Sequence, residues 1–170
     1  MFLTSHLFFY DMNKHTAHEN TLIIGVGNPI LSDDSAGILV ARRIQEIYSA
    51  STSIHVVEAS LGGIGLLDLM AGYDKVIIVD SIKTESGEPG TCYRLTVDDL
   101  GNPSYSWGPH LLDLRTAVEL GTRLGFNIPE SITIYAIEIK ENELFSEMLS
   151  PEVEDAIPCL VKKIIDDLKQ

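Results

Sequence analysis

The chain has 170 residues, 45% of them hydrophobic and 22% charged, a balance that excludes a disordered protein and fits one domain with its own core. Its formal charge of −13 would repel a phosphate backbone, so we expect no nucleic-acid partner. No stretch reaches the roughly 20 apolar residues of a membrane span, and we expect no membrane association. The two cysteines form neither a CxxC pair nor a disulfide framework, which is typical of a cytoplasmic protein.

The first 20 residues stand apart from the rest of the sequence. Residues 1–10 are mostly apolar but lack a basic leader and a small-residue cleavage site, so we do not expect a signal peptide. Regular patterning begins at Thr21, and Met12 is a candidate for the true start. We predict that residues 1–20 form an extension, either disordered or upstream of the true start, and that residues 21–170 form a single α/β domain.

Predicted strands and helices alternate along residues 21–170. Apolar runs predict strands at 21–27, 54–58, 75–80, 91–97 and 131–139. Helical spacing predicts helices from about Asp34 to Ser49, near 66–70, from His110 onward and from Pro151 onward. Pro158 predicts a kink, or two abutting helices, in the last of these. The alternation indicates an α/β fold with three layers, in which a mainly parallel, twisted sheet of about five strands has helices on both faces.

Acidic residues follow two of the predicted strands. Asp33 and Asp34 come after the first strand, at the start of a helix, and Asp80 ends the third strand. We assign Asp33 to capping the helix, which leaves Asp34 free to point elsewhere. Functional residues of open α/β sheets gather outside the carboxyl ends of the strands. If the strand order is 2-1-3, which is a hypothesis, Asp34 and Asp80 lie within reach of one ion.

A histidine could complete such a site. His110 follows a proline at a predicted helix start, and as a lone residue it would more often be a surface or capping histidine. Two carboxylates and one imidazole would form a three-ligand site with open coordination positions. Such ligands suit nickel, zinc, cobalt or cadmium. The residues by themselves indicate no more than a metal site.

A competing interpretation comes from GVGNPI (25–30), which begins like a dinucleotide-binding fingerprint. Ile30 stands where the third glycine belongs, and two carboxylates occupy the helix start that would receive a pyrophosphate. Glu58 could imitate the ribose-binding acid of that motif. Nucleotide binding therefore stays an alternative that these features disfavour.

Three blocks, taken in order, resemble the hydrogenase maturation endopeptidases. TLIIGVGNPILSDDSAG (21–37) is similar to the opening of that family, KVIIVDSI (75–82) to its third-strand block and PHLLDL (109–114) to its histidine block. The resemblance implies that Asp34, Asp80 and His110 contact nickel already installed in the hydrogenase large-subunit precursor. It further implies that the enzyme then removes a short C-terminal tail. Nickel would come with the substrate, and zinc or cadmium would substitute for it in crystals.

The resemblance leaves other points open. Glu58 matches a position where relatives often have an acid, which suggests a secondary role. Ser35 and Ala36 depart from the Gly and Val of many relatives, a difference that affects packing. The sequence contains no HExxH or GxSxG motif of other hydrolases. A non-proteolytic nickel carrier that uses the same ligands is the alternative function, and nothing in the sequence calls for more than a monomer.

Overall fold

The computed structural model describes residues 20–140 and 145–169. The strands are β1 (Thr21–Val26), β2 (Ile54–Ala59), β3 (Lys75–Thr84), β4 (Cys92–Thr96), β5 (Tyr105–Trp107) and β6 (Ser131–Glu138). The helices are α1 (Ala36–Ile47), α2 (Ile64–Met70), α3 (Leu114–Leu124) and α4 (Pro151–Leu168), with the short 3-10 helices η1 (Ser32–Ser35) and η2 (Val97–Gly101). The predicted extension lies outside the described residues except for Asn20, whose backbone bonds to Asp74 next to the start of β3.

Within the described residues, six strands form one sheet in the order β2-β1-β3-β6-β4, and β5 pairs with β3. The β2–β1, β1–β3 and β3–β6 pairs are parallel, whereas β4 and β5 run antiparallel to their neighbours. The predicted fold class is confirmed, with six strands in place of about five. The 2-1-3 order is also confirmed, so the segment that follows β1 lies next to the part of β3 that follows Val79.

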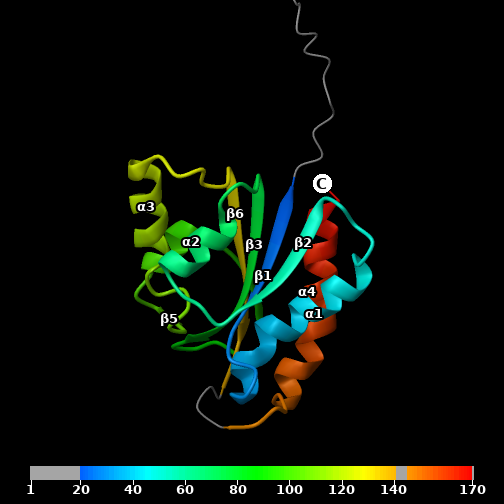
Figure 1. Ribbon diagram of the computed structural model, residues 1–170. Coiled ribbons are helices and arrows are strands. Elements are labelled where there is room, and N and C mark those ends of the chain that lie inside the picture. The colour runs from blue at the N-terminus through cyan, green and yellow to red at the C-terminus, as the bar shows by residue number, and fades with distance from the viewer. Residues whose placement is uncertain (1–19, 141–144, 170) are drawn as a thin grey trace, which may run out of the picture.

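Helices cover both faces of the sheet, as Figure 1 shows, with α2 and α3 on one side and α1 and α4 on the other. Successive residues of each central strand point to opposite faces of the sheet and pack into the hydrophobic core on that face. In β1, Leu22 and Ile24 pack towards α2 and α3, whereas Ile23 packs towards α1 and α4. No helix among residues 20–140 and 145–169 is long and apolar enough to cross a bilayer.

Strand β3 differs from its prediction, because it continues to Thr84 and does not end at Asp80. Its pairing with β1 stops at Val79, but its pairing with β6 continues to Ile82. Strand β5, which is not among the predicted strands, then bonds antiparallel to residues 82–84. Asp80 therefore lies inside a strand, yet at the first position beyond the pairing of β3 with β1.

Two predicted helices also differ in detail. His110 does not open a helix, because residues 109–113 form turns and α3 begins at Leu114. The carbonyl of His110 accepts the backbone N–H of Gly63, at the start of α2. The prediction of two abutting helices at the C-terminus is wrong, since α4 is one helix from Pro151 to Leu168. Pro158 lies on its exposed side, where the carbonyl that loses a partner can bond to water.

Candidate functional site

Glycines allow the segment after β1 to pack directly against the sheet. A Cβ on Gly37, in the first turn of α1, would collide with the backbone carbonyls of Val26 and Val79. Gly27 has a φ of 146°, and a Cβ there would collide with the carbonyl of Asp34. The start of α1 therefore rests on the carboxyl ends of β1 and of the β1-paired part of β3. This contact brings η1 and its acids next to Asp80.

Asp34 is buried in η1 and its carboxylate has several partners. One oxygen accepts the backbone N–H of Asn28 at 2.7 Å, and the other accepts the hydroxyl of Ser81 at 3.3 Å. Asn28 follows Gly27 in the loop where a dinucleotide would place its pyrophosphate. The N–H of Asn28 already donates to Asp34 and is not free for a phosphate oxygen, which further disfavours nucleotide binding.

Asp80 is fully buried on β3. One carboxylate oxygen accepts the backbone N–H of Ser81 at 2.7 Å, and the other has no hydrogen-bond partner among the described residues. Burial away from water raises the pKa of Asp80 from 3.8 to about 7, despite the opposing effects of the Ser81 bond and of His110. An unpartnered buried oxygen is costly, and such an atom indicates a group prepared for a ligand, a water or a proton.

His110 lies in the turns before α3 and is 8% exposed. Its imidazole Nε2 is 3.8 Å from the carboxylate of Asp34. This carboxylate raises the pKa of His110 most, and Asp80 adds to the effect by its charge. The backbone of Leu61, in the loop after β2, also bonds to His110. Two loops from separate parts of the sequence therefore hold the imidazole against the first carboxylate.

The three predicted site residues thus lie in one region, but they do not share one centre. Asp34 contacts His110, and Asp80 affects both through its charge. Among the described residues, no group of three His, Cys, Asp or Glu side chains is arranged to hold a metal ion. Glu58, near the carboxyl end of β2, is paired with another residue, because its carboxylate accepts two bonds of 2.8 Å from the guanidinium of Arg42 on α1.

Ser81 in this region, and Ser150 as the partner of Asp33, were not identified from the sequence. Ser81 is buried and bonds to both acids, through its N–H to Asp80 and through its hydroxyl to Asp34. Asp33 does not cap its own helix, which corrects the prediction. Its carboxylate instead accepts the N–H and the hydroxyl of Ser150, at 2.7 and 3.0 Å, and so fixes the start of α4. In the sequence, the only signal for Ser81 is its position next to Asp80. No signal near Asp33 indicates Ser150, which is 117 residues away in the chain.

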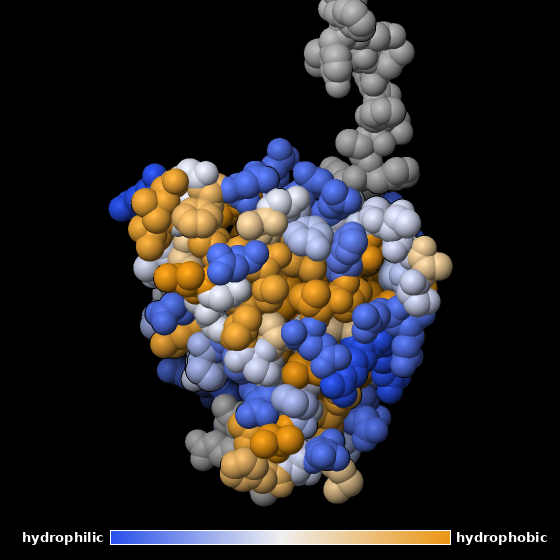
Figure 2. Space-filling view, in the orientation of Figure 1, coloured by the Kyte–Doolittle hydropathy of each residue, from blue (hydrophilic) through white to orange (hydrophobic). Residues whose placement is uncertain are grey.

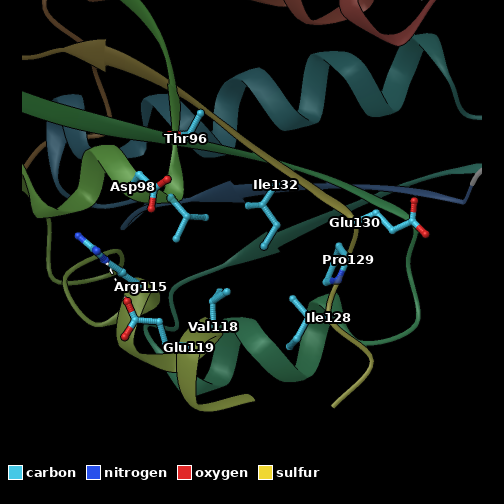
Figure 3. Close-up of a pocket in the computed structure, with 10 residues that line it drawn as sticks. Thr96, Asp98, Arg115, Val118, Glu119, Ile128, Pro129, Glu130 and Ile132 are labelled. Atoms are coloured by element: carbon cyan, nitrogen blue, oxygen red, sulfur yellow. Dashed lines mark hydrogen bonds and ion pairs between the residues drawn. The ribbon is translucent and has the colours of Figure 1, made fainter. Parts of the chain in front are cut away.

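A second cleft, shown in Figure 3, is less suited to catalysis. It lies between α3 and the amino end of β6, near Ile132. Its charged lining includes Arg115, which is paired with Glu119 at 3.1 Å. Ligand sites of open α/β sheets lie at the carboxyl ends of the strands, where Asp34, Asp80 and His110 are found.

Known proteins resemble this chain over most of its length. The sequence profile of the family described as "Hydrogenase maturation protease" matches residues 38–167. The Hydrogenase 2 maturation protease of Escherichia coli is 26% identical over 152 residues, which cover 88% of this chain and 90% of that protein. A putative hydrogenase maturation protease of Methanocaldococcus jannaschii is 26% identical over 157 residues, with 89% and 98% covered.

Solved structures support the same fold. The hydrogenase maturating endopeptidase HybD from Escherichia coli superposes with a TM-score of 0.75 at 23% identity, over 88% of this chain and 92% of that one. The NiFe hydrogenase maturation protease HybD from Thermococcus kodakarensis has a TM-score of 0.69 at 22% identity, over 89% and 99%. At these identities the structures show a shared fold, and the sequence profile shows the relationship.

Proposed function

The chain belongs to the hydrogenase maturation protease family, and from this membership we propose that it is an endopeptidase acting on the large-subunit precursor of a nickel-iron hydrogenase. It removes the C-terminal tail of the precursor once nickel is in place. We further propose that it acts as a monomer in the cytoplasm. The observation that carries the proposal is the placement of Asp34, Asp80 and His110 in one region at the carboxyl edge of the sheet.

In this proposal the nickel is part of the substrate, and the precursor supplies the ligands that complete its coordination. Asp34 and Asp80 offer carboxylate oxygens and His110 offers an imidazole nitrogen, a combination that suits nickel and also zinc or cadmium. The unpartnered oxygen of Asp80 is the one free to turn towards an incoming ion. Binding of nickel would draw the three side chains closer together and fix the adjacent peptide in the crevice.

The reaction is the hydrolysis of one peptide bond. Water adds to the carbonyl carbon, the C–N bond breaks, and a proton passes to the departing amine. The products are a large subunit with a new C-terminal carboxylate and a free tail with a new N-terminus. Nickel bound next to the scissile bond can polarise its carbonyl or lower the pKa of a bound water.

The test compares nickel-loaded with nickel-free large-subunit precursor, incubated with the purified chain and analysed by mass spectrometry. We expect cleavage of the loaded form alone. Asp34→Ala, Asp80→Ala and His110→Ala should each slow cleavage by about 100-fold or more, since even loss of a supporting group at a metal site costs about 10–100-fold. Asp98→Ala, in the cleft of Figure 3, is the control and should cleave normally.

Two results would contradict the proposal. If the three site variants cleave at the wild-type rate, the site assignment is wrong. If the chain binds nickel tightly but leaves loaded precursor intact, it is a nickel carrier and not a protease.

A further inference from the structure

A cleft opens directly beside His110, between the amino ends of α2 and α3. It is lined by Gly62 and Ile64 on one side and by Pro109, Asp113 and Leu120 on the other. Its volume is about 470 Å³, within the range of pockets that bind small ligands or a few side chains. Pro109 lines this cleft and directly precedes His110, so the cleft lies next to the loop that carries the imidazole.

Glycines hold the two walls of this cleft close together at its floor. A Cβ on Gly62 would lie 3.0 Å from the carbonyl of Pro109, and one on Gly63 would lie 3.2 Å from the Cβ of Asp113. Gly63 also has a positive φ of 52°, and its N–H bonds to the carbonyl of His110. The floor is therefore backbone, anchored to the same loop that presents the imidazole.

Two apolar residues that line the cleft are exposed, Ile64 at 63% and Leu120 at 45%. Leu61 and Leu112, which lie close in sequence to lining residues, are 51% and 68% exposed. Figure 2 shows apolar side chains gathered over α2 and the adjoining edge strand β2. Several large apolar side chains placed together at a site mark a surface that another molecule covers.

The cleft also carries one acid. Asp113 is exposed at the start of α3, and its side chain makes no capping hydrogen bond. In a chain with a net charge of −13, the exposed carboxylate of Asp113 beside an apolar cleft attracts a basic side chain and repels an acidic one.

We propose that this cleft binds the segment of the large-subunit precursor next to the scissile bond. The segment lies extended from His110, with an apolar side chain between Ile64 and Leu120 and a lysine or arginine facing Asp113. This inference rests on the proposed function, and it names the part of the enzyme that recognises the sequence around the cut.

Photo-crosslinking tests which molecule occupies the cleft. A photoreactive amino acid is placed at Ile64 or at Leu120 in the full-length chain, which is then irradiated with nickel-loaded precursor. We expect both positions to crosslink to residues beside the scissile bond. The control position is Leu124, which is 65% exposed on the same helix but does not line the cleft, and it should not crosslink to this segment. Crosslinks to a second copy of the chain, or to a distant part of the large subunit, would overturn the proposal.

Steady-state kinetics test whether the contact contributes to binding. Ile64→Glu and Leu120→Glu should each raise KM for loaded precursor by about tenfold, because an apolar side chain loses its partner, and should change kcat little. Leu124→Glu should leave both constants unchanged. Asp113→Lys should also raise KM, whereas Asp98→Lys, with the same change in net charge, should not.

The outcomes separate this inference from the function on which it rests. If the wild-type chain cleaves loaded precursor and the three cleft variants match it in KM, the inference is wrong and the protease assignment remains. If the wild-type chain cleaves neither form of the precursor, the protease assignment itself fails.

Discussion

The imidazole of His110 lies 3.8 Å from the carboxylate of Asp34, although one precedes α3 and the other precedes α1. Because this carboxylate raises the pKa of His110, the imidazole holds its proton to a higher pH than an ordinary histidine. A protonated imidazole cannot bind a metal. The contact between Asp34 and His110 therefore sets the pH above which the imidazole loses its proton and can bind a metal.

The first prediction concerns that pair. Asp34→Asn removes the charge that most favours the imidazolium, so the pKa of His110 should fall. NMR titration of the imidazole C–H resonances of the wild-type protein and the variant measures the change. Asp98→Asn, whose carboxylate lies in the cleft of Figure 3, should leave the titration of His110 in place. An unchanged or higher pKa in Asp34→Asn would show that the contact is absent in solution.

The second prediction concerns stability and Asp80. Its pKa is about 7 in the folded protein and 3.8 without burial, so the folded state binds the proton more tightly. The stability from this site is complete below about pH 4 and is lost as the pH rises towards 7. Asp80→Asn stays neutral throughout and should be more stable than wild type at pH 8, by up to about 4 kcal/mol at roughly 1.4 kcal/mol per pKa unit.

Urea unfolding at pH 8 and at pH 4 measures this difference. The gain should nearly vanish at pH 4, because both proteins are then neutral at residue 80. At pH 8, where wild type cleaves the precursor, Asp80→Asn should not, since an amide cannot replace the carboxylate as a ligand. A variant that is less stable than wild type at pH 8 would mean that the charged Asp80 has a partner in solution.

The third prediction separates the two neighbouring acids. Asp33 is fully buried and accepts two hydrogen bonds from Ser150, whereas Asp34 faces His110. Asp33→Ala leaves the start of α4 without these partners and should lower the free energy of unfolding by about 2–4 kcal/mol. Denaturant unfolding measures this loss, and the exposed Asp98→Ala should change stability by less than about 0.5 kcal/mol.

A double-mutant cycle with Ser150→Ala tests the cause. The two substitutions should combine to less than the sum of their separate effects, because both remove the same hydroxyl bond. Additive losses would mean that Asp33 stabilises the protein by some other contact.

Much of this arrangement followed from local patterns in the sequence. The alternation of apolar runs with helical spacing predicted a mainly parallel sheet, and the hypothesis of a 2-1-3 strand order placed Asp34 and Asp80 at one edge of it. The structure confirms the strand order on which that prediction depended. Local patterns could not predict hydrogen-bond partners that are distant in the chain. Strand β3 continues beyond Asp80 because β5 and β6 bond to it there, and Asp33 turns to Ser150 because α4 begins beside it.

His110 illustrates the same limit. Its position after a proline predicted a helix start. In the structure its backbone carbonyl instead accepts the N–H of Gly63, at the start of α2, and α3 begins only at Leu114. The residue was identified by resemblance, and its conformation depended on a loop that the sequence does not mark as its neighbour.

The fourth prediction concerns Gly37, where α1 touches the sheet. In an isolated helix, alanine would be more stable than glycine by about 1 kcal/mol. Here a Cβ would collide with the carbonyls of Val26 and Val79, which belong to the backbone of two central strands and cannot yield. We therefore expect Gly37→Ala to lower the free energy of unfolding by about 1–3 kcal/mol, the usual cost of overpacking. The shift of α1 should also slow precursor cleavage.

Gly121 offers a matched comparison, because it is also a buried glycine within a helix. A Cβ there would lie 2.8 Å from Leu67 and 3.0 Å from Ile128, but both contacts are with the ends of flexible side chains. Gly121→Ala should therefore be close to neutral, or stabilising, and should cleave normally. Thermal and urea unfolding of the two variants, measured side by side, give the comparison. Equal effects at both positions would mean that the contact of α1 with β1 and β3 does not hold the site in place.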